Sequence, residues 1–370
     1  MKRTMKKMVS MALTGTMAVA VLAGAGTSEV KAADKAKIGV LVADVSGEEA
    51  QGFRSYYENY IAGNYDVEFN YTDALQSAED EKTAIEKFAS QGCQAIISFS
   101  SNDRVQQIET CEKYGVYYAV ASGVLDDAQY ETYKTYEYFA GQVGPGNDTE
   151  FEAGKDMGAY YKEQGVSKVA IYGAFIPNPM HVYRVAGVLN GLGCTYGGES
   201  DMNAIAGQIF QDQTVDLSKV EGDVEVVSYL QGYGDTTTDE LNAAIQKTPD
   251  AFISVGMATT FFAQSLSEAG ISFSDIDSFT ETNGNSMKNG TLTYLAGKYS
   301  SSIGPVFALV MNAINGNVIR DEDGNAPSIS QGYLVATDSD TFDKYSVSDS
   351  GDAPIYDKET LDSIIGDNVT

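Results

Sequence analysis

The sequence predicts an α/β protein with two doubly wound, parallel-sheet lobes joined by a three-strand hinge, and three observations support this. Short, continuously apolar segments alternate with longer amphipathic ones, about thirty residues per pair. This alternation breaks at a stretch of turn-forming residues, Gln142 to Asp148, and then starts again. Finally, the 338 residues that follow an N-terminal export signal exceed what one hydrophobic core usually supports.

Residues 1–32 have the composition of a secretory signal peptide. Basic residues come first, an uncharged apolar run covers 8–24, and the tripeptide Val30-Lys31-Ala32 fits an A-x-A-like cleavage site. A membrane anchor needs about 20 apolar residues, and this run is shorter and rich in small residues. We therefore expect cleavage near Ala32. No Cys that could be lipidated follows the run, so the mature protein is expected to be free outside the cytoplasm, in the periplasm or at the cell surface.

The mature chain is strongly acidic. Residues 1–32 hold five of the 24 basic and one of the 52 acidic residues, so their removal leaves a formal charge of −32. Such a chain is repelled by phosphate backbones and by anionic lipid, which argues against nucleic-acid binding and membrane-surface roles. The three cysteines, Cys93, Cys111 and Cys194, are odd in number and far apart, which argues against a disulfide framework.

The first half of the mature chain reads as repeated β-α units. The apolar segment at residues 37–43 has the character of a parallel strand buried on both faces. In the segment 77–91, apolar residues recur at helical spacing and Gly92 is a suitable end. The remaining expected elements are strands at 65–71, 95–98 and 116–121 and helices at 50–61 and 104–114.

The second half repeats the pattern after the break. Expected helices cover 151–164, 182–192, 238–247 and 259–269, and expected strands cover 168–172, 224–229 and 251–255. Each unit implies a right-handed crossover between neighbouring parallel strands. Two halves of similar size therefore predict two doubly wound lobes.

Four segments, in order, resemble a known family. They are Asp73–Ala78 with Ile85–Ser98, then Val143–Asn147 with Gly154, then His181–Gly191, and finally Pro249–Gly256 with Ala263–Ile271. Together they resemble the type I periplasmic binding proteins, in particular the ribose/galactose group that serves ABC transporters. The resemblance covers residues 38–316 and implies three crossings between the lobes, near Val143, near Lys298 to Tyr299, and near Ala326 to Ser328. The implied lobes are residues 33–143 plus 299–327, and 144–298 plus 328–370.

The expected binding site is the cleft between the lobes, because ligands of open parallel sheets bind outside the carboxyl ends of the strands. The loops that follow the expected strands line this cleft, and they include Gln51, Ser101 and Tyr233. A neutral polyol favours forked hydrogen bonds from planar side chains, and aromatic rings against its C–H faces. Tyr233 is one candidate for such a ring, although packing explains many of the 24 tyrosines.

The resemblance implies further contacts. Arg184 stands where the family carries a ligand-gripping arginine; the alternative is a helix arginine paired with a surface carboxylate. Asp103 stands where the family carries a sugar-binding aspartate in its first lobe. The alternative is that Asp103 caps the following helix. Asn147, at the first crossing, could contact the ligand or stabilise a turn.

Other positions depart from the ribose-type pattern. Met257 and Glu281 stand where that group carries Asn and Asp, and Lys298 stands in place of a Gln. These three residues remain candidate contacts, but the departures argue against a plain aldopentose or aldohexose as the ligand.

The sequence argues against an enzyme and predicts neither a cofactor nor a metal. The sequence has a single histidine, His181, which argues against a catalytic triad and against a zinc site built from histidines. Neither a nucleophile-elbow nor a phosphate-binding glycine motif occurs. The acidic turn Asp321–Asn325 lacks the closing ligand of a calcium loop.

The leading hypothesis is a monomeric solute-binding protein that captures a sugar or sugar-like compound for an ABC importer in the membrane. One alternative has the same fold: a purine-nucleoside receptor of the basic-membrane-protein group, although its early Asp-x-Ser-Phe-Asn motif is absent. The other alternative is a ligand-sensing module for a membrane signalling partner.

Overall fold

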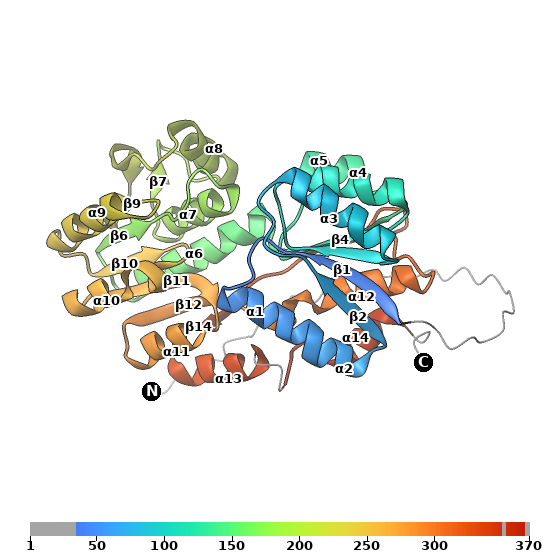
Figure 1. The fold of residues 1–370 in the computed structure, drawn as a ribbon. Coiled ribbons are helices and arrows are strands. Elements are labelled where there is room, and N and C mark those ends of the chain that lie inside the picture. The colour runs from blue at the N-terminus through green and yellow to red at the C-terminus, as the bar shows by residue number, and fades with distance from the viewer. Residues whose placement is uncertain (1–34, 350–352, 367–370) are drawn as a thin grey trace, which may run out of the picture.

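The computed structural model describes residues 35–349 and 353–366, which form two lobes, each built on a six-stranded sheet (Figure 1). The expected signal peptide lies outside the described residues. The first sheet has the order β13-β5-β4-β3-β1-β2 and the second β14-β12-β11-β10-β6-β9. All pairings in both sheets are parallel except that of β14 with β12. The predicted fold class is confirmed.

The first lobe contains these strands and helices: β1 (Ala36–Leu41), α1 (Glu48–Ser55), a π-helical segment (Tyr56–Ile61), α2 (Ala62–Asn64), β2 (Val67–Tyr71), α3 (Ala78–Ser90), β3 (Ala95–Ser98), α4 (Arg104–Tyr114), β4 (Tyr117–Ala121), α5 (Asp127–Tyr133), β5 (Phe139–Gly144), a 3-10 turn (Ser300–Ile303), α12 (Gly304–Ile314), β13 (Ser328–Ser330) and α14 (Lys358–Ile365). Apolar clusters pack on both faces of the sheet. This explains why strands such as β3 are apolar and buried along their whole length.

The second lobe contains these: α6 (Asn147–Glu163), β6 (Lys168–Tyr172), α7 (Pro179–Gly191), β7 (Thr195–Tyr196), α8 (Met202–Asp212), a 3-10 turn (Leu217–Lys219), β8 (Val220–Glu221), β9 (Glu225–Leu230), α9 (Asp235–Gln246), β10 (Ala251–Ser254), α10 (Ala258–Ala269), β11 (Ser272–Ser278), α11 (Glu281–Lys288), β12 (Leu292–Lys298), β14 (Leu334–Ala336) and α13 (Ser339–Asp349). The short strands β7 and β8 pair with each other outside the main sheet.

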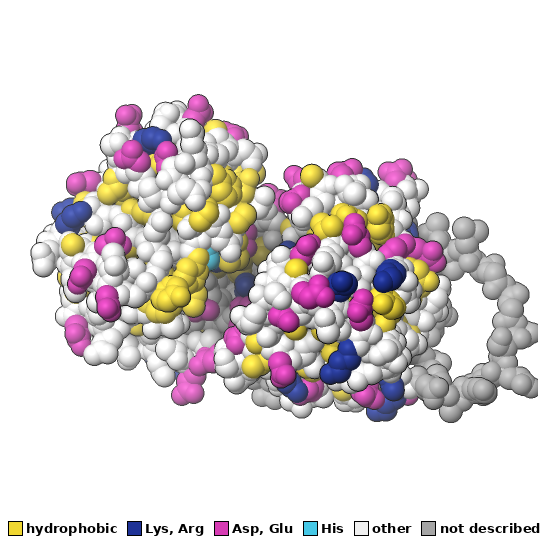
Figure 2. Space-filling view, turned by 45° about the horizontal axis from the view of Figure 1, so that its top comes forward, with side chains coloured by type: hydrophobic (Ala, Val, Ile, Leu, Met, Phe, Trp, Pro, Cys, Tyr) yellow, Lys and Arg dark blue, Asp and Glu magenta, His cyan; other side chains and the backbone are white. Residues whose placement is uncertain are grey.

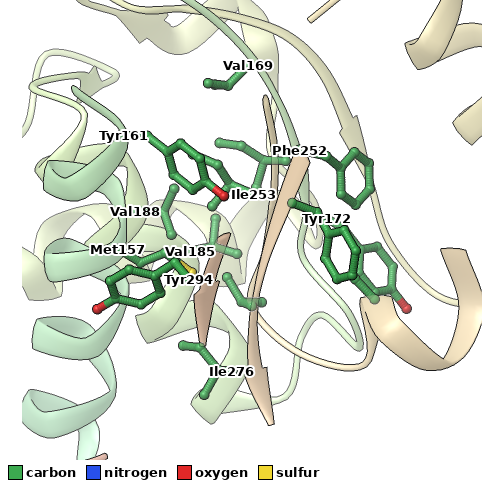
Figure 3. Close-up of a cluster of buried hydrophobic side chains, with 14 of the residues drawn as sticks. Met157, Tyr161, Val169, Tyr172, Val185, Val188, Phe252, Ile253, Ile276 and Tyr294 are labelled. Carbon is green, nitrogen blue, oxygen red and sulfur yellow. The ribbon is translucent and has the colours of Figure 1, made fainter. Parts of the chain in front are cut away.

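Helices α6 and α7 pack unusually closely over one face of the second sheet. Figure 3 shows Met157 and Tyr161 of α6 beside Val185 and Val188 of α7, against side chains of the strands. Four glycines, two on each helix, lie where an added Cβ would clash with the facing backbone: Gly154, Gly158, Gly187 and Gly191. The glycines therefore allow the two backbones to approach, and this fixes the first turn of α7 relative to the cleft.

The chain passes from lobe to lobe between β5 and α6, between β12 and the 3-10 turn at Ser300, and between β13 and β14. The third crossing lies later in the chain than the sequence suggested. Residues 328–330 pair with β5 in the first sheet, whereas the predicted division placed residues 328–370 in the second lobe.

The C-terminal helix α14 also belongs to the first lobe. It packs on α12, to whose apolar cluster it adds Leu361 and Ile365. The reason is the composition of α12, because its residues Gly304–Ala313 are all buried and need cover on the side away from the sheet. Within the described residues, none of the helices combines the length and the apolarity that a membrane crossing requires.

Candidate functional site

A cleft of about 1170 Å³ separates the two lobes, at the carboxyl ends of the strands of the first sheet. Figure 2 shows the surface hollowed between the lobes at this place. Most of the lining comes from the first lobe, chiefly from α1 and from the loops after β1, β3, β4 and β5. The second lobe adds the first turns of α6 and α7, part of α8, and Lys298 at the end of β12. The cleft thus lies where the topology predicts a ligand site.

Aromatic rings form one part of the first-lobe wall. Phe53 of α1 and Phe99, which follows β3, stack with ring centroids 5.3 Å apart. Beside them, the guanidinium of Arg54 lies 4.4 Å from the ring centroid of Tyr71. The hydroxyl of Tyr71 is enclosed and lacks a hydrogen-bond partner among the described residues. This wall can offer flat apolar faces and a polar atom to a bound molecule.

Arg104 is the cationic side chain of this wall that has no ion pair among the described residues. Its Nη1 donates to the carbonyl of Val124 at 2.7 Å, and its Nε is enclosed without a partner. Burial lowers the pKa of Arg104 from its ordinary value. An enclosed, unsatisfied guanidinium N–H is uncommon in native proteins, and in a cleft it is suited to donate to a ligand oxygen.

From the sequence, Asp103, the neighbour of Arg104, was the predicted ligand contact. Asp103 caps α4, because its Oδ1 accepts a hydrogen bond from the amide of Gln106 at 2.9 Å, and it does not line the cleft. This is the alternative that the sequence left open for Asp103. Asp103 and Arg104 both follow the end of β3, so the sequence favours neither of them over the other as the ligand contact. The contacts that assign them separate roles lie elsewhere in the chain.

Three further candidates, two from the first lobe and one from the start of α6, are divided. Ser101 and Asn147 line the cleft, both exposed, and Asn147 is the first residue of α6. Gln51 is exposed on α1, where its amide donates to the carbonyl of Ser46 at 2.9 Å, and it does not line the cleft.

Arg184 is buried behind the cleft surface. Its Nε donates to Glu150 at 2.6 Å, its Nη1 to the carbonyl of Val255 at 2.8 Å, and its Nη2 to the hydroxyl of Tyr333 at 2.7 Å. Its side chain is 3% exposed and does not line the cleft. The structure therefore shows the carboxylate-paired alternative, although the pair is buried and not at the surface. The charge of Glu150 raises the pKa of Arg184 against the opposing effect of burial.

Tyr233 and Met257 belong to an apolar patch on the second lobe. Tyr233 is 71% exposed, with Phe261 stacked on it at 6.1 Å and Phe175 edge-on at 5.7 Å. Met257 and Phe261 are exposed by 37% and 39%. These residues follow β6, β9 and β10, at the carboxyl edge of the second sheet. None of the four is part of the cleft lining as the lobes now stand.

Lys298 lies at the point where the lobes touch. Its Nζ is 3.3 Å from Oε1 of Glu49 on α1, and the other oxygen of Glu49 accepts from the hydroxyl of Ser278 at 2.8 Å. On the far side of this contact is a smaller cavity of about 240 Å³, lined in part by Glu281, Ser278 and Lys298. Glu49 and Lys298 line both spaces.

The cysteines and the acidic turn do not line the cleft. The three cysteines are buried and unpaired, and burial raises the pKa of Cys93 to about 11. The acidic turn closes on itself, with Asp321 accepting from the amides of Asp323 and Asn325. Between residues 35 and 366, leaving out 350–352, no cluster of three or more His, Cys, Asp or Glu side chains is arranged to hold a metal ion.

The sequence matches no protein-family model and no curated protein. Solved structures do match. The arabinose-binding component of an ABC transporter from Shewanella sp. ANA-3, bound to L-arabinofuranose, is 16% identical, with a TM-score of 0.59 over 84% of this chain and 94% of that one. A solute-binding protein from Actinobacillus succinogenes 130z with bound D-allose is also 16% identical, with a TM-score of 0.62 over 84% and 100%.

The myo-inositol-binding protein of Caulobacter is 14% identical, with a TM-score of 0.60 over 87% of this chain and 98% of that one. The first two are periplasmic binding proteins of ABC transporters with bound sugars and the third binds myo-inositol, so the resemblance seen in the sequence motifs is confirmed at the level of the fold. At such low identity the likeness extends to the fold alone.

Proposed function

Because the chain has the fold of the type I periplasmic binding proteins, we propose that it captures a small, sugar-like solute between its two lobes for an ABC importer. The single observation that carries this proposal is the first-lobe wall of the cleft. There the Phe53–Phe99 stack lies beside two enclosed polar atoms without partners, the Arg104 Nε and the Tyr71 hydroxyl. Flat apolar faces beside unsatisfied donors suit a polyol, which has both C–H faces and hydroxyl groups.

Capture on this proposal proceeds by closure of the lobes about the three crossings. In the present arrangement the loops after β9 and β10 do not reach the cleft lining, so the first lobe presents most of the site. Closure would bring the aromatic patch around Tyr233 toward the ring pair of Phe53 and Phe99. The ligand would then contact both lobes and stabilise the closed form by its differential affinity for it.

The charges around the cleft favour a neutral ligand. Lys298 and Arg54 are already paired with Glu49 and Glu58, and Arg184 is paired with Glu150. Only Arg104, among the cleft-lining cations in the described chain, is left to meet a ligand oxygen. A strongly anionic solute would encounter unpaired acidic residues at the cleft rim, such as Asp127 and Asp148, which repel it.

The test is a thermal-shift screen of the mature chain against monosaccharides, inositols, oligosaccharides, purine nucleosides and amino acids. A ligand present at 100 times its Kd should add about 2.7 kcal/mol to the free energy of unfolding. Stabilisation by a sugar or inositol supports the proposal. Stabilisation by purine nucleosides alone would favour the nucleoside-receptor alternative over the proposed function. Chemical conversion of any of the compounds would show that the protein is an enzyme.

The proposed partner is a membrane permease, and a monomeric receptor is expected. Small-angle scattering with and without the ligand from the screen tests closure directly. A smaller radius of gyration in the bound state supports closure of two rigid lobes. An unchanged radius at saturation would mean that the pocket is preformed.

A further inference from the structure

The one histidine of the chain occupies an unusual position on the second lobe. His181 lies in the first turn of α7 and is only 5% exposed. Its Nδ1 accepts a hydrogen bond from the amide of Phe175 at 3.1 Å. Because Nδ1 uses its lone pair in this bond, the proton of the neutral ring is on Nε2. The contact therefore fixes the ring as a donor at Nε2 and leaves no free lone pair to abstract a proton.

The Nε2 atom has no hydrogen-bond partner in the part of the chain that the structure describes. The Nε2 atom is also not fully enclosed by the protein, so it keeps access to solvent. Figure 2 shows the imidazole, the one cyan side chain, at the surface of the second lobe where this faces the first lobe. His181 does not line the cleft as the lobes now stand, so a bound molecule would meet this donor when the lobes close on it.

Gly256, which is buried, leaves a methyl-sized space beside this donor. A Cβ added at Gly256 would lie 3.7 Å from His181 Nε2 and 3.6 Å from Arg184 Nη1. These are ordinary contact distances, so an alanine would fit without disturbing the backbone. Its methyl group would fill space within contact distance of Nε2, to which an acceptor atom has to approach within about 3 Å.

Aromatic rings surround the same opening. The centroid of the Phe175 ring is 5.8 Å from that of the imidazole, and Phe175 packs edge-on against the exposed ring of Tyr233. In Figure 2 a group of hydrophobic side chains lies directly beside the imidazole. An isolated donor next to exposed ring faces matches a polyol ring, which offers an acceptor oxygen at its edge and C–H groups on its face.

Burial lowers the pKa of His181 to about 4, and the positive charges of Arg184 and Lys298 act in the same direction. The ring is therefore neutral at pH 7, in agreement with the tautomer that the Phe175 contact requires.

We infer that His181 is a ligand-contacting residue that donates its Nε2–H to an acceptor oxygen of a neutral polyol ring lying against Tyr233. This inference rests on the proposed function and adds to it a specific contact on the second lobe. His181 binds and orients the ligand, and Gly256 gives the ligand access to it.

The test uses three variants with opposed expectations. His181→Asn keeps an oxygen that can accept from Phe175 but loses the Nε2 donor, whereas His181→Gln can restore a donor near Nε2 but loses the acceptor for Phe175. Gly256→Ala leaves the imidazole intact and blocks its approach. Affinity is measured by calorimetry with L-arabinose, D-allose and myo-inositol, and folding by thermal unfolding without ligand.

For whichever probe binds the parent chain, His181→Asn and Gly256→Ala should weaken binding about threefold to tenfold, the range for one neutral hydrogen bond. His181→Gln should bind within about twofold of the parent but unfold at a lower temperature than His181→Asn. This opposite order of affinity and stability would not result from a purely structural histidine.

Imidazole NMR gives an independent readout, because the single histidine produces one set of signals in a chain purified without a histidine tag. At pH 7 the ¹⁵N shifts should show the Nε2–H tautomer, and they should move on addition of the probe that binds. Binding of His181→Asn with the parent's affinity, or an unmoved imidazole signal at saturation, would overturn the contact while leaving the proposed function in place. A parent chain that binds none of the three probes or any other polyol overturns both.

Discussion

Arg184 and Glu150 form a buried ion pair, with 2.6 Å between Nε and Oε2 and both side chains at most 4% exposed. The pair joins α6 to α7, and Tyr333 extends it to the third crossing, because its hydroxyl lies 2.9 Å from both oxygens of Glu150. One network therefore ties the start of the second lobe to the strand that returns to it. Its position makes it a part of the hinge, and of its three members only Glu150 lines the cleft.

Substitution of Arg184 should destabilise the fold. Arg184→Ala leaves the carboxylate of Glu150 buried without its partner, and loss of one member of such a pair costs about 3–5 kcal/mol. Urea unfolding of the mature chain measures this. The double variant Arg184→Met with Glu150→Leu should lose less than the sum of the two single losses, since no uncompensated charge remains. Unchanged stability with abolished ligand binding would return Arg184 to the ligand site.

Arg104 should behave in the opposite way. Arg104→Ala removes a charged donor from the cleft, so affinity for the ligand should fall on the order of tenfold to a hundredfold. Arg104→Lys should restore little, because an ammonium cannot replace the planar fork. Arg54→Ala is the comparison on the same wall, with a smaller expected loss, because Glu58 already pairs with Arg54. Calorimetry on the three variants decides, and equal affinity of Arg104→Ala and the parent would remove Arg104 from the site.

Glu49 should influence the opening of the lobes. Glu49→Gln weakens the contact with Lys298 across the cleft, so the ligand-free form should become more open and its radius of gyration larger. The bound form should not change in size. Glu48→Gln, the exposed neighbour, serves as the control in small-angle scattering. Identical ligand-free radii for the parent and Glu49→Gln would show that the contact does not hold the lobes.

Asp275 should give stability an unusual dependence on pH. Burial, with the nearby charge of Asp277, raises the pKa of Asp275 to about 7 in the folded chain, against about 4 when unfolded. The folded state then holds a proton that the unfolded state releases, so this residue's contribution to stability falls as pH rises from about 4 to 7. Above pH 7 the contribution is constant.

The measurement is the difference in unfolding free energy between the parent and Asp275→Asn at several pH values. Between about pH 4 and 7 this difference should change by about 1.4 kcal/mol per pH unit in favour of the variant as pH rises. Contributions of groups that do not interact with Asp275, including the opposing one of His181, are common to both proteins and cancel, whereas that of Asp277 changes with Asp275. A difference that is flat between pH 4 and 7 would show that Asp275 titrates near its ordinary pKa.

Sequence patterns predicted the two sheets well because parallel strands buried on both faces are continuously apolar. The fully buried β3 is an example. They did not predict α14, which is short and polar except for the face that carries Leu361 and Ile365. Its place depends on the bare surface of α12, more than forty residues earlier. Local pattern does not contain that relationship.

The position of the cleft could be predicted from the sequence, whereas the contacts of the individual candidate residues could not. Strand-end loops place the cleft correctly because topology fixes where the strands end. The separate roles of Arg104 and Arg184 depend on their partners, and Glu150 lies 34 residues from Arg184 in the chain. Helical spacing and composition give no information about such a pairing. The exposed position of Tyr233, by contrast, follows from its place after β9.

The position of α14 on α12 also sets an order of assembly. The chain emerges from a ribosome or an export channel with its N-terminus first, and β1 to β5 of the first lobe appear before any part of the second. The apolar α12 nevertheless stays uncovered until residue 365 has emerged. The lobe that is synthesised first is therefore completed last. A chaperone that protects exposed apolar helices would be needed longest for that lobe, and a chain shortened to residue 349 would keep an aggregation-prone surface even with its binding cleft intact.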